Sequence, residues 1–190
     1  MKLAKLVLAS SLVASCAFAE GVFVGVVGGY NFQAEVQTKD TDVTIKDKQG
    51  FFGLKGGYDF GTYRAYGQYN YNLKFTKDFV YAGNMEKAEF KGHEFLVGTD
   101  WTPSINENLK LAVGPYFGYS ILKVKDNVDP DSTSENGWIL GGKVGAIVDT
   151  GVGEFEAGVK ADKAWHKGKN DWVDMDKTTV GLYLGYNFKF

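Results

Sequence analysis

Cysteine and proline are almost missing from this chain of 190 residues, which has one cysteine and three prolines. A collagen-like protein needs abundant proline and a three-residue glycine period, and neither is present, so that class is excluded. No uncharged apolar run of about 18 residues follows the N-terminal segment, so a bundle of membrane helices is excluded as well. The formal net charge of −2 gives no reason to expect a nucleic-acid partner.

Glycine and aromatic residues are plentiful instead. The chain has 25 glycines, and 15% of its residues are aromatic. Glycine is thus about twice as frequent as its usual ~7%. The many aromatic and β-branched residues exclude a disordered chain. The length predicts a single domain.

Residues 1–19 have the three parts of a secretory signal. Lys2 and Lys5 form a basic end, an apolar stretch follows, and Ala17-Phe18-Ala19 places small residues where a signal peptidase reads them. Cleavage after Ala19 would leave Glu20 as the first residue of an exported bacterial domain, 20–190. The mature domain would carry 19 basic and 23 acidic residues, a net charge of −4.

The only cysteine allows an alternative interpretation of the same segment. Val13-Ala14-Ser15-Cys16 resembles a bacterial lipobox, which would make Cys16 a lipidated N-terminus. Cleavage after Ala19 would instead remove Cys16 and leave a mature chain with neither a disulfide nor a thiol.

From residue 21 onward the dominant hydrophobic period is two, which predicts strands with two unlike faces. In the last segment Leu182, Leu184 and Phe188 alternate with Gly181, Tyr183 and Gly185. Each such segment is about as long as a tilted strand that crosses a bilayer. The pattern predicts eight strands: 22–32, 51–60, 63–75, 90–101, 109–122, 138–149, 154–165 and 180–190.

The predicted connections alternate in length. Residues 61–62, 103–108 and 151–153 are short, whereas 33–49, 76–88, 123–136 and 166–176 are long, polar and charged. Short turns at one end and long loops at the other are typical of an outer-membrane barrel. An even number of strands places both termini at the short-turn, periplasmic end. We therefore predict an all-β fold, an eight-stranded antiparallel up-and-down transmembrane β-barrel with tilted strands.

A soluble eight-stranded barrel of the lipocalin kind is the alternative, and it would turn the apolar face inward. The glycines distinguish the two kinds of barrel, because many of them fall on the face that carries the charges. Glycine on a solvated exterior weakens strands without any packing gain. In a membrane barrel that face lines a lumen wide enough only for side chains, where small residues are needed beside long charged ones. The apolar face also carries aromatic residues near the strand ends, as expected at the two membrane interfaces: Phe60, Tyr63, Trp101, Trp138 and Trp165.

The ending Gly181-Leu-Tyr-Leu-Gly-Tyr-Asn-Phe-Lys-Phe190 resembles the C-terminal signal of bacterial outer-membrane barrels. In that signal, alternating hydrophobic residues, here Tyr186, Phe188 and Phe190, end on a terminal phenylalanine. The mature chain as a whole resembles the small eight-stranded family of Gram-negative bacteria that includes the OmpA transmembrane domain, OmpX, OmpW and the opacity-type porin-like proteins. The resemblance implies an integral protein of the cell outer membrane that the barrel-assembly machinery inserts. It does not imply one function, because the fold hosts anchors, adhesins, enzymes and narrow channels.

The inward face predicts a network of charges that plugs the lumen. If Gly61-Thr62 is a two-residue turn, Asp59 faces Arg64, the only arginine of the chain. An unpaired charge inside the barrel would be costly, so we expect the lumen charges to pair. An alternative is a gate that opens when pairs exchange. The predicted network comprises Lys55, Asp59, Arg64, Glu94, Asp100, Lys143, Glu156, Lys160 and Asp162.

No motif supports catalysis, a cofactor or a metal, and we expect none of the three. The only histidines, His93 and His166, match no catalytic pattern. Lys163, Lys167 and Lys169 beside Trp165 form an edge that could meet lipopolysaccharide phosphates or be an ordinary solvated loop.

The expected function is a structural or surface-interaction role. In that role the long loops would contact lipopolysaccharide or a ligand on a host or neighbouring cell. We expect a monomer. A narrow porin-like channel for small solutes is the alternative, and an outer-membrane lipid-modifying enzyme ranks third.

Overall fold

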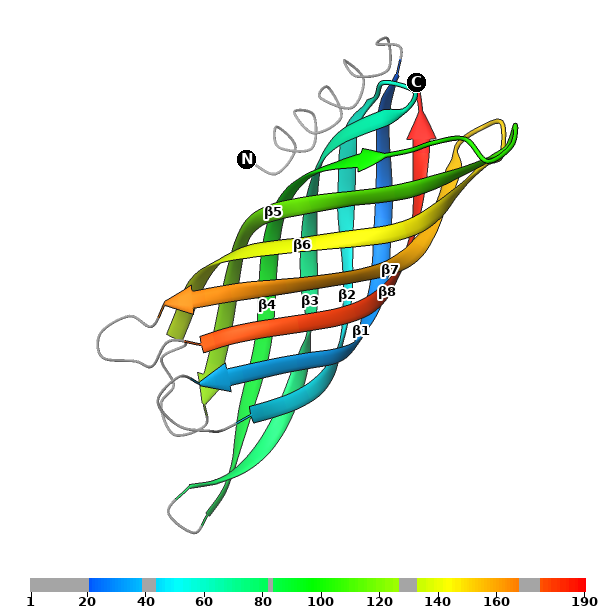
Figure 1. The fold of residues 1–190 in the computed structure, drawn as a ribbon. Helices are drawn as coiled ribbons and strands as arrows, with labels where there is room; N and C mark the ends of the chain where they lie inside the picture. The colour runs from blue at the N-terminus through cyan, green and yellow to red at the C-terminus, as the bar shows by residue number, and fades with distance from the viewer. Residues whose placement is uncertain (1–20, 39–43, 82–83, 127–132, 168–174) are drawn as a thin grey trace, which may run out of the picture.

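The computed structural model describes residues 21–38, 44–81, 84–126, 133–167 and 175–190, which form eight strands in one closed, tilted barrel (Figure 1). Each strand pairs antiparallel with the next, and the last pairs with the first. All strands follow the order of the sequence: β1 Val22–Thr38, β2 Thr44–Asp59, β3 Tyr63–Tyr81, β4 Asn84–Trp101, β5 Leu109–Asp126, β6 Thr133–Asp149, β7 Glu154–Lys167 and β8 Met175–Lys189. The prediction of an eight-stranded up-and-down barrel is confirmed.

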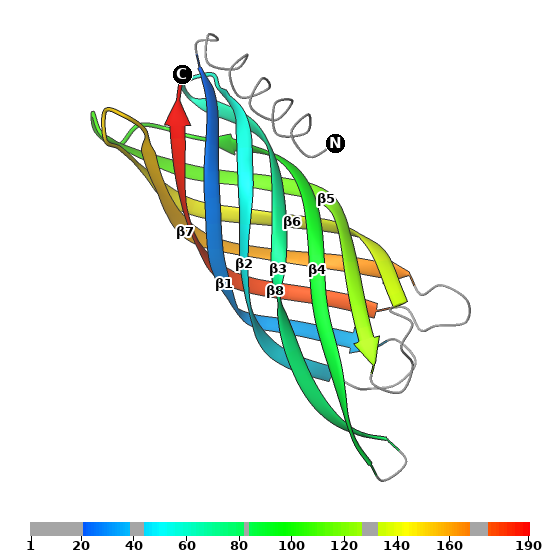
Figure 2. The ribbon, with the colours of Figure 1, turned by 180° about the vertical axis from the view of Figure 1, so that it is seen from behind.

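The three connections β2–β3, β4–β5 and β6–β7 lie at one end of the barrel, beside the start of β1 and the C-terminus (Figures 1 and 2). We call this the turn end. Two of these turns share an Asp-x-Gly design, in which the aspartate accepts a hydrogen bond from the backbone N–H of the glycine at 2.8 Å, Asp59 with Gly61 and Asp149 with Gly151. Both glycines have positive φ, +90° and +83°, which other residues rarely adopt.

The strands extend further from the turn end than the sequence pattern predicted. Much of the segments 33–49, 76–88, 123–136 and 166–176, expected to be long loops, continues the paired strands. Only two residues separate β3 from β4. Register shifts after Asn31 and Asn72 interrupt the alternation. A prediction based on a strict period of two therefore ends these strands too early.

Many of the large exposed side chains of the barrel wall are apolar. Phe60 and Trp138 are both 66% exposed, and Leu54 is 60% exposed. The buried side chains point into the lumen, and they include aromatic and aliphatic residues as well as charged ones. Two apolar clusters lie inside, one of Val27, Phe51 and Tyr183, the other of Leu96, Tyr116, Ile139 and Ala164.

Two sequence predictions lie outside the described residues: the signal segment with its cleavage between Ala19 and Glu20, and the lipidation of Cys16. Among the described residues, no helix is long and apolar enough to cross a membrane.

Candidate functional site in the barrel lumen

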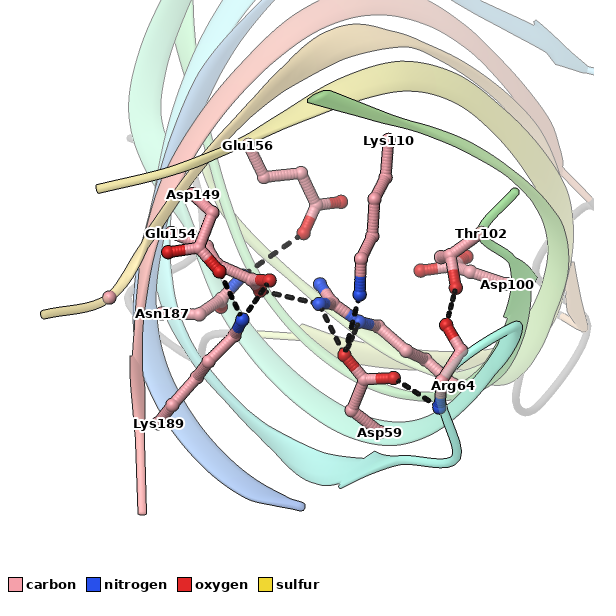
Figure 3. A network of polar contacts seen from close by, with 12 residues as sticks. Asp59, Arg64, Asp100, Thr102, Lys110, Asp149, Glu154, Glu156, Asn187 and Lys189 are labelled. Carbon is pink, nitrogen blue, oxygen red and sulfur yellow. Dashed lines mark hydrogen bonds and ion pairs between the residues drawn. The ribbon is translucent and has the colours of Figure 1, made fainter. Parts of the chain in front are cut away.

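The turn end of the lumen is crossed by an ion-pair layer centred on Arg64 of β3 (Figure 3). Its Nη2 lies 2.6 Å from Asp59 Oδ2 and 2.5 Å from Glu154 Oε2. Asp59 is the cross-strand neighbour of Arg64, whereas Glu154 comes from β7 across the barrel. The planar guanidinium suits this role because it presents several donors in a fixed geometry.

Lys189 of β8 extends the same layer toward solvent. Its Nζ lies 2.6 Å from Glu154 Oε1 and 2.7 Å from Asp149 Oδ2. At this water-exposed mouth, the hydrogen bond from Lys189 lowers the pKa of the Asp149 carboxyl, and the backbone N–H of Gly151 lowers that pKa further. Lys110 adds a longer contact of 3.6 Å to Asp59. The layer thus joins strands on opposite sides of the barrel (Figure 3).

Deeper in the lumen lies a second layer of two lysines and two carboxylates. Glu156 accepts hydrogen bonds from Lys55 at 2.8 Å and from Lys143 at 2.6 Å. Lys143 also lies 2.8 Å from Asp100, and Lys55 lies 3.8 Å from the same carboxylate. All four side chains are buried. Equal numbers of opposite charges let each buried ion meet a counter-ion, as buried charges require.

Aromatic rings pack around these lysines. The Nζ atoms of Lys55 and Lys143 lie 4.3 Å and 4.5 Å from the ring centre of Tyr66, within cation–π distance. The Nζ of Lys160 lies 4.4 Å from the ring centre of Phe51.

The cavity that remains in the middle of the lumen is small. Its volume of about 20 Å³, among Val27, Phe51, Tyr116 and Lys160, exceeds only slightly what one water needs. Around this cavity the described side chains leave room for about one water.

A third group of polar contacts lies beyond that cavity. Asp162 accepts hydrogen bonds from Tyr116 at 2.7 Å and from Lys160 at 3.3 Å, and a short one from Thr179. Glu94 accepts from two neighbours on β3, at 3.1 Å from Asn70 and 2.6 Å from Asn72.

A further polar layer, on the side away from the turn end, contains Lys177 and His166, which were not predicted to lie in the lumen. The buried ammonium of Lys177 donates to Gln49 Oε1 at 2.9 Å. His166 Nε2 lies 3.2 Å from Ser120 Oγ. Within the described structure the other ring nitrogen of His166 has no hydrogen-bond partner, so no carboxylate orients this ring as in a catalytic triad.

The nine charged residues named from the sequence all project into the lumen or its turn-end mouth. The contacts join Asp59 to Arg64, and they join Lys55, Asp100, Lys143 and Glu156 to one another. Lys160 pairs with Asp162, whereas Glu94 bonds to asparagines. The predicted network did not include Glu154, although this residue lies two positions before Glu156 and therefore on the same face of β7.

The aromatic residues expected at the membrane interfaces lie on the outer wall. Phe60, Tyr63 and Trp101 are at the turn end, where Tyr63 and Trp101 are cross-strand partners. Trp138 and Trp165 face each other across β6 and β7, farther from the turn end. Of the three terminal residues named, Phe188 and Phe190 are exposed and Tyr186 is half-buried.

No group of three or more histidine, cysteine, aspartate or glutamate side chains within the described residues could hold a metal ion.

Comparison with solved structures shows the fold. The Neisserial surface protein A structure matches with a TM-score of 0.65 and 15% identity, covering 90% of this chain and 98% of that chain. The attachment invasion locus protein Ail of Yersinia pestis matches with a TM-score of 0.51 and 22% identity, covering 90% and 100%. Outer membrane protein H of P. aeruginosa gives 0.53 and 20%, covering 90% and 99%.

No protein-family model matches the chain, and no curated protein matches it either. The closed barrel of eight antiparallel strands is the fold of small outer-membrane β-barrels, and this chain has that fold. Its apolar outer wall and charged interior are the arrangement that a barrel in a lipid bilayer requires.

Proposed function

We propose that the chain is an integral outer-membrane protein with a structural or surface-interaction role, and that its lumen is a plug. The observation that supports a plugged lumen is the nearly filled interior. Ion pairs cross the barrel between Arg64 and Glu154 and between Lys55 and Glu156, and the cavity beside them holds about one water. In this proposal, such an interior gives a hydrated solute no continuous route through the barrel.

The outer wall supports membrane residence. A closed barrel pairs the backbone of every strand with its neighbours, which the hydrocarbon core demands. Exposed apolar side chains such as Leu54, Phe117 and Leu140 would promote aggregation in water, whereas lipid acyl chains would solvate them.

In this proposal the turn end faces the periplasm and the extended hairpins face the outside, where they contact lipopolysaccharide or a ligand on another cell surface. The barrel-assembly machinery reads the terminal Tyr186, Phe188 and Phe190. The protein acts as a monomer and is not an enzyme.

Conductance in planar lipid bilayers tests the plug. We expect no single-channel events from the wild-type protein, and none from Arg64→Ala, because Phe51, Tyr116 and Tyr183 still fill the middle of the lumen. Lys163→Ala is the matched control, since it removes an ion pair to Asp176 on the outer wall.

Reproducible channels from the wild-type protein, altered by Arg64→Ala but not by Lys163→Ala, would contradict the plug and establish the narrow channel instead.

A further inference from the structure

Two lysines face each other on the outer wall of the barrel. Lys91 of β4 and Lys123 of β5 are direct cross-strand partners. Their chain neighbours Gly92 and Leu122 are buried toward the lumen, so the alternation of the strands points both lysines outward. Side chains directly opposite each other in an antiparallel pair have Cβ atoms about 5 Å apart.

No described side chain compensates the charges of this pair. Lys163, on the same outer wall, forms an ion pair of 3.0 Å with Asp176. The lysines in the lumen have carboxylate or amide partners. Across the described residues, Lys91 and Lys123 have neither an ion pair nor a hydrogen bond. Like charges directly opposite destabilise a sheet, so an anion from outside the chain would relieve this pair.

The height of the pair identifies where that anion lies. Lys91 is ten residues from Trp101, and Lys123 is ten residues from Val113, the cross-strand partner of Trp101. Ten residues rise about 33 Å along a strand, which at a tilt of about 40° is roughly 25 Å of height. An apolar band of a membrane barrel is about that tall. The pair therefore lies at the level of lipid headgroups when Trp101 lies at the opposite interface.

The outer wall just below the pair is aromatic. The next outward residue on β4 is His93, whose Nδ1 lies 2.8 Å from the hydroxyl of Tyr69. The ring of His93 also packs against Tyr71 at 5.2 Å, and the outward residue on β5 is Ile121. These side chains form an apolar and aromatic surface on the outer wall, beneath the two lysine ammonium groups. A lipid fits that arrangement, with an acyl chain against this surface and an anionic headgroup above it.

We propose that Lys91 and Lys123 bind one phosphate group of a phosphorylated glycolipid in the outer leaflet. This inference rests on the proposed membrane location and names the lipid contact that the proposal left open. Each ammonium donates to phosphate oxygens, and the phosphate charge cancels the repulsion between the two lysines.

The test compares the effect of Lys123→Gln on the unfolding temperature in two kinds of vesicle. Lys123→Gln is refolded into vesicles of phosphatidylcholine mixed with bis-phosphorylated lipid A, and into matched vesicles whose lipid A has lost both phosphates. Unfolding temperature is read from heat-dependent gel migration. Relative to wild type, we expect a decrease of roughly 2–4 °C in the phosphorylated vesicles. Without the phosphates we expect no decrease or a small increase, because the variant removes only repulsion.

Lys163→Gln is the matched control: the ammonium of Lys163 is already paired with Asp176, so this variant should respond equally in both kinds of vesicle. Equal shifts of Lys123→Gln in both vesicles would overturn the proposal. An equal stabilisation of the wild type by inorganic phosphate added to the dephosphorylated vesicles would overturn the lipid as the source of the anion. Failure of the wild-type protein to insert into either vesicle would instead contradict the proposed membrane location.

Discussion

At the scale of single residues, Arg64 holds the turn end of the lumen together. It is the only arginine of the chain, its side chain is almost fully buried, and it joins Asp59 to Glu154 from the other side of the barrel. Removing one partner of a buried ion pair leaves an uncompensated charge, which costs far more than an exposed pair contributes.

Arg64→Ala is expected to lower the free energy of unfolding by about 3–5 kcal/mol, because two carboxylates lose their shared counter-ion. Urea unfolding of the refolded protein in lipid vesicles measures this. Arg64→Lys should lose less, since it keeps the charge but not the planar geometry. Lys163→Ala, which breaks an exposed pair, should cost about 1 kcal/mol or less. An Arg64→Ala cost no larger than that of Lys163→Ala would refute the assigned role.

At the scale of the strand, neighbouring glycines of β6 have opposite surroundings. A Cβ on Gly141 would lie 2.5 Å from the Tyr116 ring and 2.6 Å from Asp162 Cβ inside the lumen. A Cβ on Gly142, which points outward, would approach nothing closer than 3.7 Å. The high glycine content therefore reflects crowding on the inner face at some positions and not at others.

Gly141→Ala is accordingly expected to destabilise the barrel by about 1–3 kcal/mol, through overpacking. Gly142→Ala should be close to neutral or slightly stabilising, because it adds only lipid-facing surface and restricts the unfolded chain. The same urea experiment compares the two variants. Equal effects would show that the inner face has room to spare.

The C-terminal strand allows a separate test of assembly. The backbone N–H of Phe190 donates to Val22 at 3.0 Å, while its ring is exposed on the outer wall. Phe190→Ala keeps this backbone bond, so the barrel refolded in detergent should keep its unfolding temperature. In cells, the amount of heat-modifiable protein in the membrane fraction should fall if the ring is read during insertion. Unchanged assembly in cells would contradict the predicted role of Phe190 in the insertion signal.

The alternation of apolar and polar residues was enough to predict the number of strands, their order and the face of most residues, but not beyond the register shift after Asn72, where Lys74 was expected in the lumen and is exposed. It was not enough for the ends of the strands farthest from the turns, because the residue types there become polar on both faces once the wall leaves the apolar band. Pairs along a ladder, such as Asp59 with Arg64, follow from turn length. The contact of Arg64 with Glu154 does not, because it depends on closure of the barrel and on which side chains meet across it.

At the scale of the whole molecule, the distribution of polar and apolar side chains is the reverse of that in a soluble protein. The buried charged and amide side chains lie within the lumen beside some aromatic and aliphatic ones, and many large apolar side chains face outward around the barrel. The central claim is that lipid solvates this outer wall. Trp138 is a natural probe of it, being 66% exposed on the wall and packed edge-on against Tyr119 at 5.5 Å.

The most direct measurement is the fluorescence of Trp138 in a variant whose three other tryptophans are phenylalanine, refolded into vesicles with brominated acyl chains. Bromine quenches indole only at close contact, so we expect strong quenching by lipids brominated near the headgroup and weak quenching by aqueous acrylamide. Emission that brominated lipids leave unchanged and acrylamide quenches would contradict it, because the outer wall would then face water.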